Sequence, residues 1–129
     1  SLINTLLGIV IDPVTMRPAL ACRYGGLSGP AIRPVAVRCV WQVRAAFPDV
    51  PIIGTGGVRT GRDALELLLA GASMIAVGTE ITHDPSACSR VLRELEEELA
   101  AIGVDRAADV IGQAHGTRGR VSRGLARPV

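Results

Sequence analysis

Lysine is absent from this chain, and all 14 of its basic residues are arginine. Four of these arginines lie in a C-terminal segment that contains no acid: Arg118, Arg120, Arg123 and Arg127. Without them the net charge of +2 becomes −2. The rest of the chain therefore lacks the basic excess of a nucleic-acid surface. We expect residues 116–129 to form an Arg-rich, solvated and disordered tail.

Long apolar runs are also lacking. The stretch around residues 65–72 is broken by charge or glycine well before the roughly 20 apolar residues that cross a bilayer. No signal peptide is visible at the N-terminus, so we expect a cytoplasmic protein without membrane contact. The two histidines have no second ligand at metal spacing, and no metal is expected. The three cysteines are too widely spaced for a disulfide pattern and are expected to be reduced, structural thiols: Cys22, Cys39 and Cys88.

Apolar segments alternate with helical patterns along the chain. We predict a buried strand at residues 2–11 that continues into a hairpin arm, followed by a glycine-rich loop at residues 24–30. Further strands are predicted at residues 50–54 and 74–77. Apolar residues at helical spacing predict helices at residues 31–47, from Thr60 or Gly61 to Ala70, at 88–102 and at 105–111. Strands that are apolar on both faces and alternate with helices indicate a parallel sheet covered on both sides.

Three parallel strands cannot close a barrel, and a TIM barrel takes about 250 residues. We therefore expect an α/β fold that is the C-terminal portion of a TIM (β/α)₈ barrel within a longer polypeptide. Residues 1–115 would form its last three strands, with a hairpin insertion after the first.

Two glycine-rich turns end successive predicted strands. They are Gly54-Thr55-Gly56-Gly57 and Gly78-Thr79. Each would expose backbone N–H groups at the carboxyl ends of the strands, where a phosphate can be bound. Either turn alone is more often a tight connection, but the pair, one strand-helix unit apart, predicts a phosphate-bearing ligand. Flavin mononucleotide (FMN), a sugar phosphate and a nucleotide all satisfy this pattern.

A longer set of motifs narrows the choice. The segments 3–6 (Ile-Asn-Thr-Leu), 24–34, 51–58, 70–73 and 76–79 resemble, in order and spacing, the C-terminal half of class 1 dihydroorotate dehydrogenases. The Asn-Thr-Leu opening and the Gly-Gly-Leu-Ser-Gly-Pro-Ala-Ile loop are similar to class 1B, whose catalytic subunit works with an iron–sulfur flavoprotein carrying FAD. The resemblance spans roughly residues 1–115.

The resemblance implies roles for eight residues. Asn4 and Thr5 would hydrogen-bond the pyrimidine substrate, and Asn offers the donor and acceptor that an alternating amide ring requires. The cofactor FMN would be lined or held through its phosphate by six others: Ile3, Gly29, Gly56, Gly57, Gly78 and Thr79.

The implied reaction is FMN-dependent oxidation of dihydroorotate to orotate in pyrimidine biosynthesis, by an enzyme that is expected to be a homo-oligomer. The catalytic base of this class is a cysteine on a loop of the first half, where lysines contact flavin and substrate, so no catalytic residue is assigned here. Two alternatives remain open. One is another FMN or sugar-phosphate barrel, such as a dihydropyrimidine dehydrogenase-like domain, and the other is a non-catalytic half-barrel.

Overall fold

The computed structural model describes residues 1–116. Apart from Gly116, the predicted Arg-rich tail lies outside these described residues. No helix among them is both long and apolar enough to cross a membrane.

A small parallel sheet lies at the centre of the fold. Strands β5 (Ile53–Thr55) and β6 (Met74–Ala76) pair in parallel, with Ile53 opposite Met74. On the other side of β5, Leu2 forms a parallel bridge to Gly54. The amide of Leu2 donates to the Ile53 carbonyl (2.9 Å), and that of Ile3 donates to Thr55 (2.8 Å). Three parallel segments therefore lie side by side, as the sequence predicted, but the first is shorter than expected.

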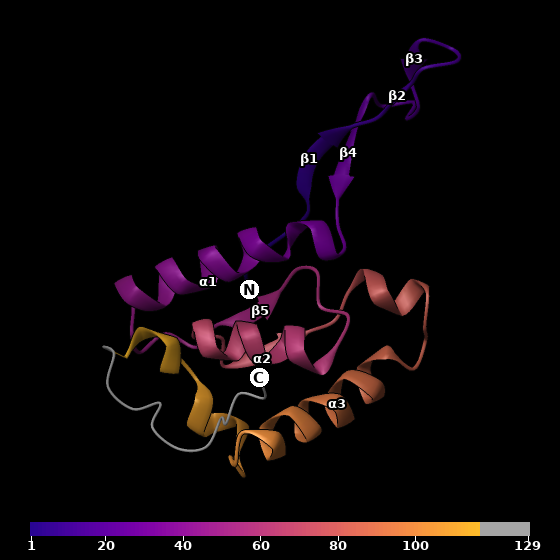
Figure 1. Cartoon of the computed structure of the whole chain (residues 1–129). Helices are drawn as coiled ribbons and strands as arrows, with labels where there is room; N and C mark the ends of the chain where they lie inside the picture. The colour runs from indigo at the N-terminus through magenta and orange to yellow at the C-terminus, as the bar shows by residue number, and fades with distance from the viewer. Residues whose placement is uncertain (117–129) are drawn as a thin grey trace, which may run out of the picture.

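The chain leaves this sheet after Ile3 and forms a projecting hairpin arm. Strand β1 (Leu6–Ile9) pairs antiparallel with β4 (Tyr24–Leu27), and β2 (Ile11–Asp12) pairs with β3 (Arg17–Pro18) near the tip. Figure 1 shows the arm extending away from the helices. The prediction of a buried strand at residues 2–11 is therefore wrong beyond Ile3. Apolar side chains of the arm are exposed, Leu7 to 81%.

Three α-helices cover one side of the sheet (Figure 1). They are α1 (Arg33–Ala46), α2 (Gly61–Ala70) and α3 (Ala87–Ala101), and α2 contacts both of the others. The short 3₁₀ segments are η1 (Pro30–Ile32), η2 (Thr79–Thr82), η3 (Ala107–Val110) and η4 (Gln113–His115). The helix predicted at residues 105–111 is therefore only the single turn η3.

The position of α2 is set by strong local signals. Thr60 accepts a hydrogen bond from the Asp63 amide while the Asp63 carboxylate accepts from the Thr60 amide, which is a capping box. Gly71 ends the helix in the left-handed conformation, with φ 117°. Between these ends, α2 contributes most to a core shared with α1, α3 and the strands. Its members include Val40, Ile52, Ala64, Leu67, Leu68, Ala72, Val91, Leu95 and Leu99.

The other face of the sheet is open. Ile53 and Met74 are paired neighbours on it and are 40% and 63% exposed. Successive side chains of a strand point to opposite faces of the sheet, and the helices cover one of these faces. The exposed side chains of Ile53 and Met74 therefore lie on the face opposite the helices.

The end of the described chain packs on the outer side of the helices. The ring of His115 stacks on Trp41 of α1, with ring centroids 3.7 Å apart and planes at 16°. His115 Nε2 also lies 2.9 Å from the carbonyl oxygen of Ala70 in α2. Trp41 is thus a packing residue of the outer helical layer.

Candidate functional site

A hollow of about 810 Å³ opens at the carboxyl ends of the three parallel segments. This volume lies in the range of sites that enclose a cofactor-sized molecule. All eight residues that the sequence predicted to bind cofactor or substrate line this one hollow: Ile3, Asn4, Thr5, Gly29, Gly56, Gly57, Gly78 and Thr79. The fold therefore brings together residues from four separate parts of the chain.

The glycines of the first turn are required by the fold itself. Gly56 and Gly57 have φ values of 124° and 76°, which side chains rarely adopt. A Cβ on Gly57 would lie 2.8 Å from the Gly29 carbonyl oxygen and 2.8 Å from Cβ of Arg33. A side chain at Gly57 would therefore meet the protein before it met any ligand.

Gly78, in the second turn, is different. Its φ of −111° is negative, and a Cβ built on it meets no protein atom within 4 Å. A methyl group at this position would project into open space, and Gly78 lines the hollow. Gly78 is therefore the glycine at which a close ligand, rather than the protein, would be sensitive to a side chain.

The N-terminus of α2 is closed to a ligand. Asp63 Oδ2 accepts from the amides of Arg59 and Thr60, both at 3.0 Å, and Glu94 Oε2 accepts from the amide of Gly61 at 2.9 Å. Within residues 1–116, by contrast, no loop or side-chain hydrogen bond uses the amides of Gly57, Gly78 or Thr79. These three N–H groups, and not the first turn of α2, are the donors available to an anion.

Asn4 and Thr5 lie where the first parallel segment turns into the arm. Asn4 Oδ1 accepts from the Thr5 amide at 2.7 Å, which is a local contact typical of a turn. Asn4 lines the hollow, and its side-chain N–H₂ group has no partner among the described residues. Thr5 packs closely over Gly26 of β4, where a Cβ would lie 2.3 Å from the Thr5 hydroxyl oxygen. The side-chain N–H₂ of Asn4 is therefore free to donate a hydrogen bond to a ligand. The position of Thr5 is fixed by its packing against β4 of the arm.

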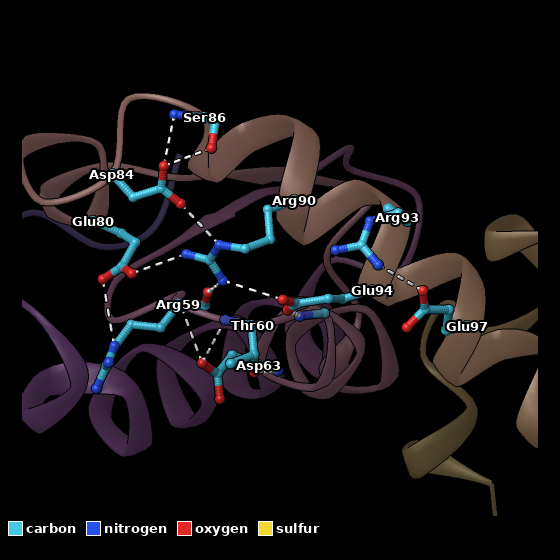
Figure 2. Close-up of polar contacts among 11 residues, drawn as sticks. Arg59, Thr60, Asp63, Glu80, Asp84, Ser86, Arg90, Arg93, Glu94 and Glu97 are labelled. Atoms are coloured by element: carbon cyan, nitrogen blue, oxygen red, sulfur yellow. Dashed lines mark hydrogen bonds and ion pairs between the residues drawn. The ribbon is translucent and has the colours of Figure 1, made fainter.

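Three further polar residues that line the hollow were not predicted from the sequence. Arg59, Glu80 and His83 line it, and Arg59 and Glu80 form an ion pair at 3.4 Å. Each follows a glycine turn by a few residues, which is the signal that could have identified them. In Figure 2 the Glu80 carboxylate lies between the side chains of Arg59 and Arg90.

Hydrogen bonds fix the charge state of the surrounding carboxylates. A hydrogen bond from Ser86, which has the larger effect, and one from Arg90 lower the pKa of Asp84 from 3.8 to about 2. The Gly61 amide, followed by Arg90, lowers the pKa of Glu94. The Glu94 carboxylate thereby bridges α3 to α2. Both groups are ionised near neutral pH and hold their partners as full charges.

The cysteines lie away from the hollow. Cys22 is exposed on the arm, and neither Cys39 nor Cys88 lines the site. Residues 1–116 contain no group of three or more His, Cys, Asp or Glu side chains placed to hold a metal ion.

The parallel segments, their helical cover and the hollow at their carboxyl ends define an α/β protein with a site built on strand-end loops. A family model described as dihydroorotate dehydrogenase matches residues 1–99. The chain belongs to the dihydroorotate dehydrogenase family.

Relatives support this assignment over most of the chain. The catalytic subunit of dihydroorotate dehydrogenase B (NAD(+)) from Geobacter sp. (strain M21) is 54% identical over 112 residues, which cover 87% of this chain and 36% of that protein. The same subunit from Desulforudis audaxviator is 51% identical over 119 residues, covering 92% of this chain and 38% of that protein.

A solved structure agrees with the fold. The crystal structure of DHODH in complex with ferulenol from Eimeria tenella superposes with a TM-score of 0.70 at 32% sequence identity, over 84% of this chain and 30% of that one. This likeness supports the TIM-barrel class of α/β fold that the sequence predicted. The chain spans little more than a third of the length of the curated relatives it matches.

Proposed function

We propose that this chain supplies the FMN phosphate cradle and part of the substrate site of a dihydroorotate dehydrogenase that oxidises (S)-dihydroorotate to orotate. The observation that carries the proposal is the meeting of all eight expected binding residues in one hollow. The chain would contribute the last three strands of a TIM barrel, with the projecting arm inserted after the first.

The described residues fit FMN at its phosphate end. Three amides without a partner among the described residues, one from the first glycine turn and two from the second, belong to residues that line the same hollow, and backbone N–H groups are common phosphate ligands. Gly78 leaves open space for close approach. The Thr79 hydroxyl adds a possible donor, and Ile3 offers an apolar surface. When bound, FMN would accept the hydride that leaves the substrate.

The same residues would position the substrate but not deprotonate it. The Asn4 N–H₂ group would donate to a ring carbonyl, while its oxygen remains bonded to the Thr5 amide. Thr5, fixed against Gly26, would hold its hydroxyl at a defined position. The proton-abstracting cysteine implied by the family resemblance is none of the three cysteines here, since none lines the hollow. We infer that this group, and the lysines that the family uses, belong to other parts of the enzyme.

The matched relatives are named as NAD(+)-dependent catalytic subunits. We infer on this basis that the electrons leave FMN for a partner subunit with an iron–sulfur centre and FAD, which passes them to NAD⁺.

The test uses the full-length protein that contains this chain. Flavin released from the purified protein by acid is expected to be FMN, and dihydroorotate added without oxygen should bleach the absorbance of the bound flavin. Protein without flavin, or flavin that dihydroorotate does not reduce, would contradict the proposal.

A further inference from the structure

One arginine outside the hollow joins the two loops that form the proposed phosphate cradle. The guanidinium of Arg90, on α3, donates from Nη1 to the Arg59 carbonyl oxygen at 2.9 Å and to Glu94 at 3.2 Å. Its Nη2 donates to Glu80 at 3.0 Å, and its Nε donates to Asp84 at 2.8 Å. Figure 2 shows these contacts converging on one side chain.

The partners of Arg90 belong to different loops. Arg59 follows the turn that contains Gly56 and Gly57, whereas Glu80 and Asp84 follow the turn that contains Gly78. The parallel pairing of β5 with β6 ends at Thr55 and Ala76. Beyond that pair, no backbone hydrogen bond within the described chain joins residues 56–61 to residues 77–84. The spacing of the two loops therefore depends on side chains.

The other side-chain links are weaker or lead back to Arg90. Arg59 reaches Glu80 directly at 3.4 Å, but its side chain is 58% exposed, and an exposed ion pair contributes little. Glu94 extends the reach of Arg90, because its second carboxylate oxygen accepts from the Gly61 amide at 2.9 Å. The Arg90 side chain is only 29% exposed, so its bonds are better shielded from water.

We propose that Arg90 is a positioning residue that holds the two glycine turns at the separation required to bind the FMN phosphate. This inference rests on the proposed FMN site. Arg90 would not touch the ligand, and it would act only through the spacing of the three cradle amides of Gly57, Gly78 and Thr79. The planar fork of a guanidinium suits this task, because it directs several donors at fixed angles, which the single ammonium of lysine cannot do.

The test compares FMN with riboflavin, which lacks the phosphate, in the full-length protein stripped of flavin. In the wild type FMN should bind more tightly than riboflavin. Arg90→Lys keeps the charge but loses the fork, and it should reduce that preference by about tenfold while leaving the affinity for riboflavin nearly unchanged. A general loss of structure would weaken both ligands alike.

Arg93→Lys is the matched control. Arg93 lies on the same helix, and among the described residues its side chain pairs only with Glu97, both about two-thirds exposed; it forms no hydrogen bond or ion pair to either loop. Its substitution should leave the preference unchanged. Glu80→Gln breaks the same link from the loop side and should reduce the preference in the same direction, so it carries the test if Arg90→Lys does not fold.

The outcomes separate the two proposals. If the wild type binds FMN and riboflavin equally, the proposed phosphate site is wrong. If the wild type prefers FMN but Arg90→Lys and Glu80→Gln keep the full preference, the phosphate site stands and the positioning role of Arg90 is overturned.

Discussion

At the scale of single residues, Gly78 and Gly57 have different reasons to be glycine. Gly78→Ala adds a methyl group that meets no protein atom within 4 Å. We expect FMN affinity to fall by about tenfold, equivalent to ~1.4 kcal/mol, with the free energy of unfolding nearly unchanged. Flavin titration and urea denaturation of the full-length protein measure the two effects.

Two further substitutions control this prediction. Gly57→Val should lower both stability and flavin content, since its side chain meets Arg33 and the Gly29 carbonyl at a φ of 76°. Gly8→Ala, in β1 of the arm, meets only ordinary contacts at 3.7 Å or more and should change neither. Unaltered FMN affinity in Gly78→Ala would place the phosphate elsewhere.

Asn4 tests the substrate half of the site. Asn4→Ala in the full-length enzyme should lower kcat/KM by about 5- to 150-fold, the range for a lost hydrogen bond that leaves a buried substrate group unpaired. The flavin spectrum should be retained. Steady-state kinetics with dihydroorotate provide the measurement.

Asn4→Asp separates binding from local structure. An aspartate oxygen can still accept from the Thr5 amide, as Asn4 Oδ1 does at 2.7 Å, but the N–H₂ donor is lost. If Asn4 binds substrate, both Asn4→Ala and Asn4→Asp should therefore lower kcat/KM. If Asn4→Asp keeps normal kinetics while Asn4→Ala is merely less stable, Asn4 is only a turn residue.

Asp84 makes stability depend on pH in the acid range. Its pKa in the folded protein is about 2, below the ordinary 3.8, because Ser86 and Arg90 donate to it. The folded state therefore gains stability from the ionised carboxylate above 3.8 and loses it as the pH falls toward 2. Asp84→Asn should lower stability near neutral pH, and its difference from the wild type should disappear near pH 2. Urea denaturation at both pH values tests this, and a difference that does not vary with pH would contradict it.

At the scale of elements, α2 depends on its cap. Thr60→Ala removes the oxygen that accepts from the Asp63 amide at 3.3 Å and should lower the free energy of unfolding by about 1 kcal/mol. Thr60→Ser keeps the hydroxyl and should cost much less. Denaturant titration distinguishes the two variants, and equal stability of Thr60→Ala and wild type would show that Asp63 and Glu94 alone hold this helix end.

The sequence predicted those elements whose signals are local. The ends of α2 follow from Thr60, Asp63 and Gly71, which all lie within or beside the helix. The apolar run at residues 2–11 was misassigned because its composition suits a strand but does not select a partner. Only Leu2 and Ile3 pair with β5, while the residues of β1 pair with residues of β4 that lie 15 or more positions later in the chain.

In the candidate site, too, the local motifs could be predicted and the contacts between distant residues could not. The glycine turns and the Asn-Thr pair are short local motifs, and the structure brings all of them to one hollow. The contact of the Glu94 carboxylate with the start of α2 could not be predicted, because helical spacing describes only residues of the same helix. Its bond to Gly61 spans 33 residues, and no periodic pattern reports such a contact.

At the scale of the whole molecule, the described sheet has an uncovered face and an unpaired edge on β6. We expect a polypeptide of these 129 residues to show no dihydroorotate oxidation and to retain no FMN through gel filtration. Open strand edges favour association over a defined site, and the family's lysines and cysteine base are absent from the hollow. Activity assay and flavin absorbance test this, with the full-length subunit as the positive control. Turnover by the 129-residue polypeptide would contradict it.

The contact between Trp41 and His115 gives the molecule an optical property. Trp41 is the only tryptophan in the chain, and its indole ring lies against an imidazole ring at a centroid distance of 3.7 Å. Indole emission is sensitive to a stacked neighbour and to water, so it changes whenever residues 113–115 separate from α1. The intrinsic fluorescence of this one ring thus reports the docking of the last described segment, and it can follow the denaturant titrations of the Thr60 and Asp84 variants without an added dye.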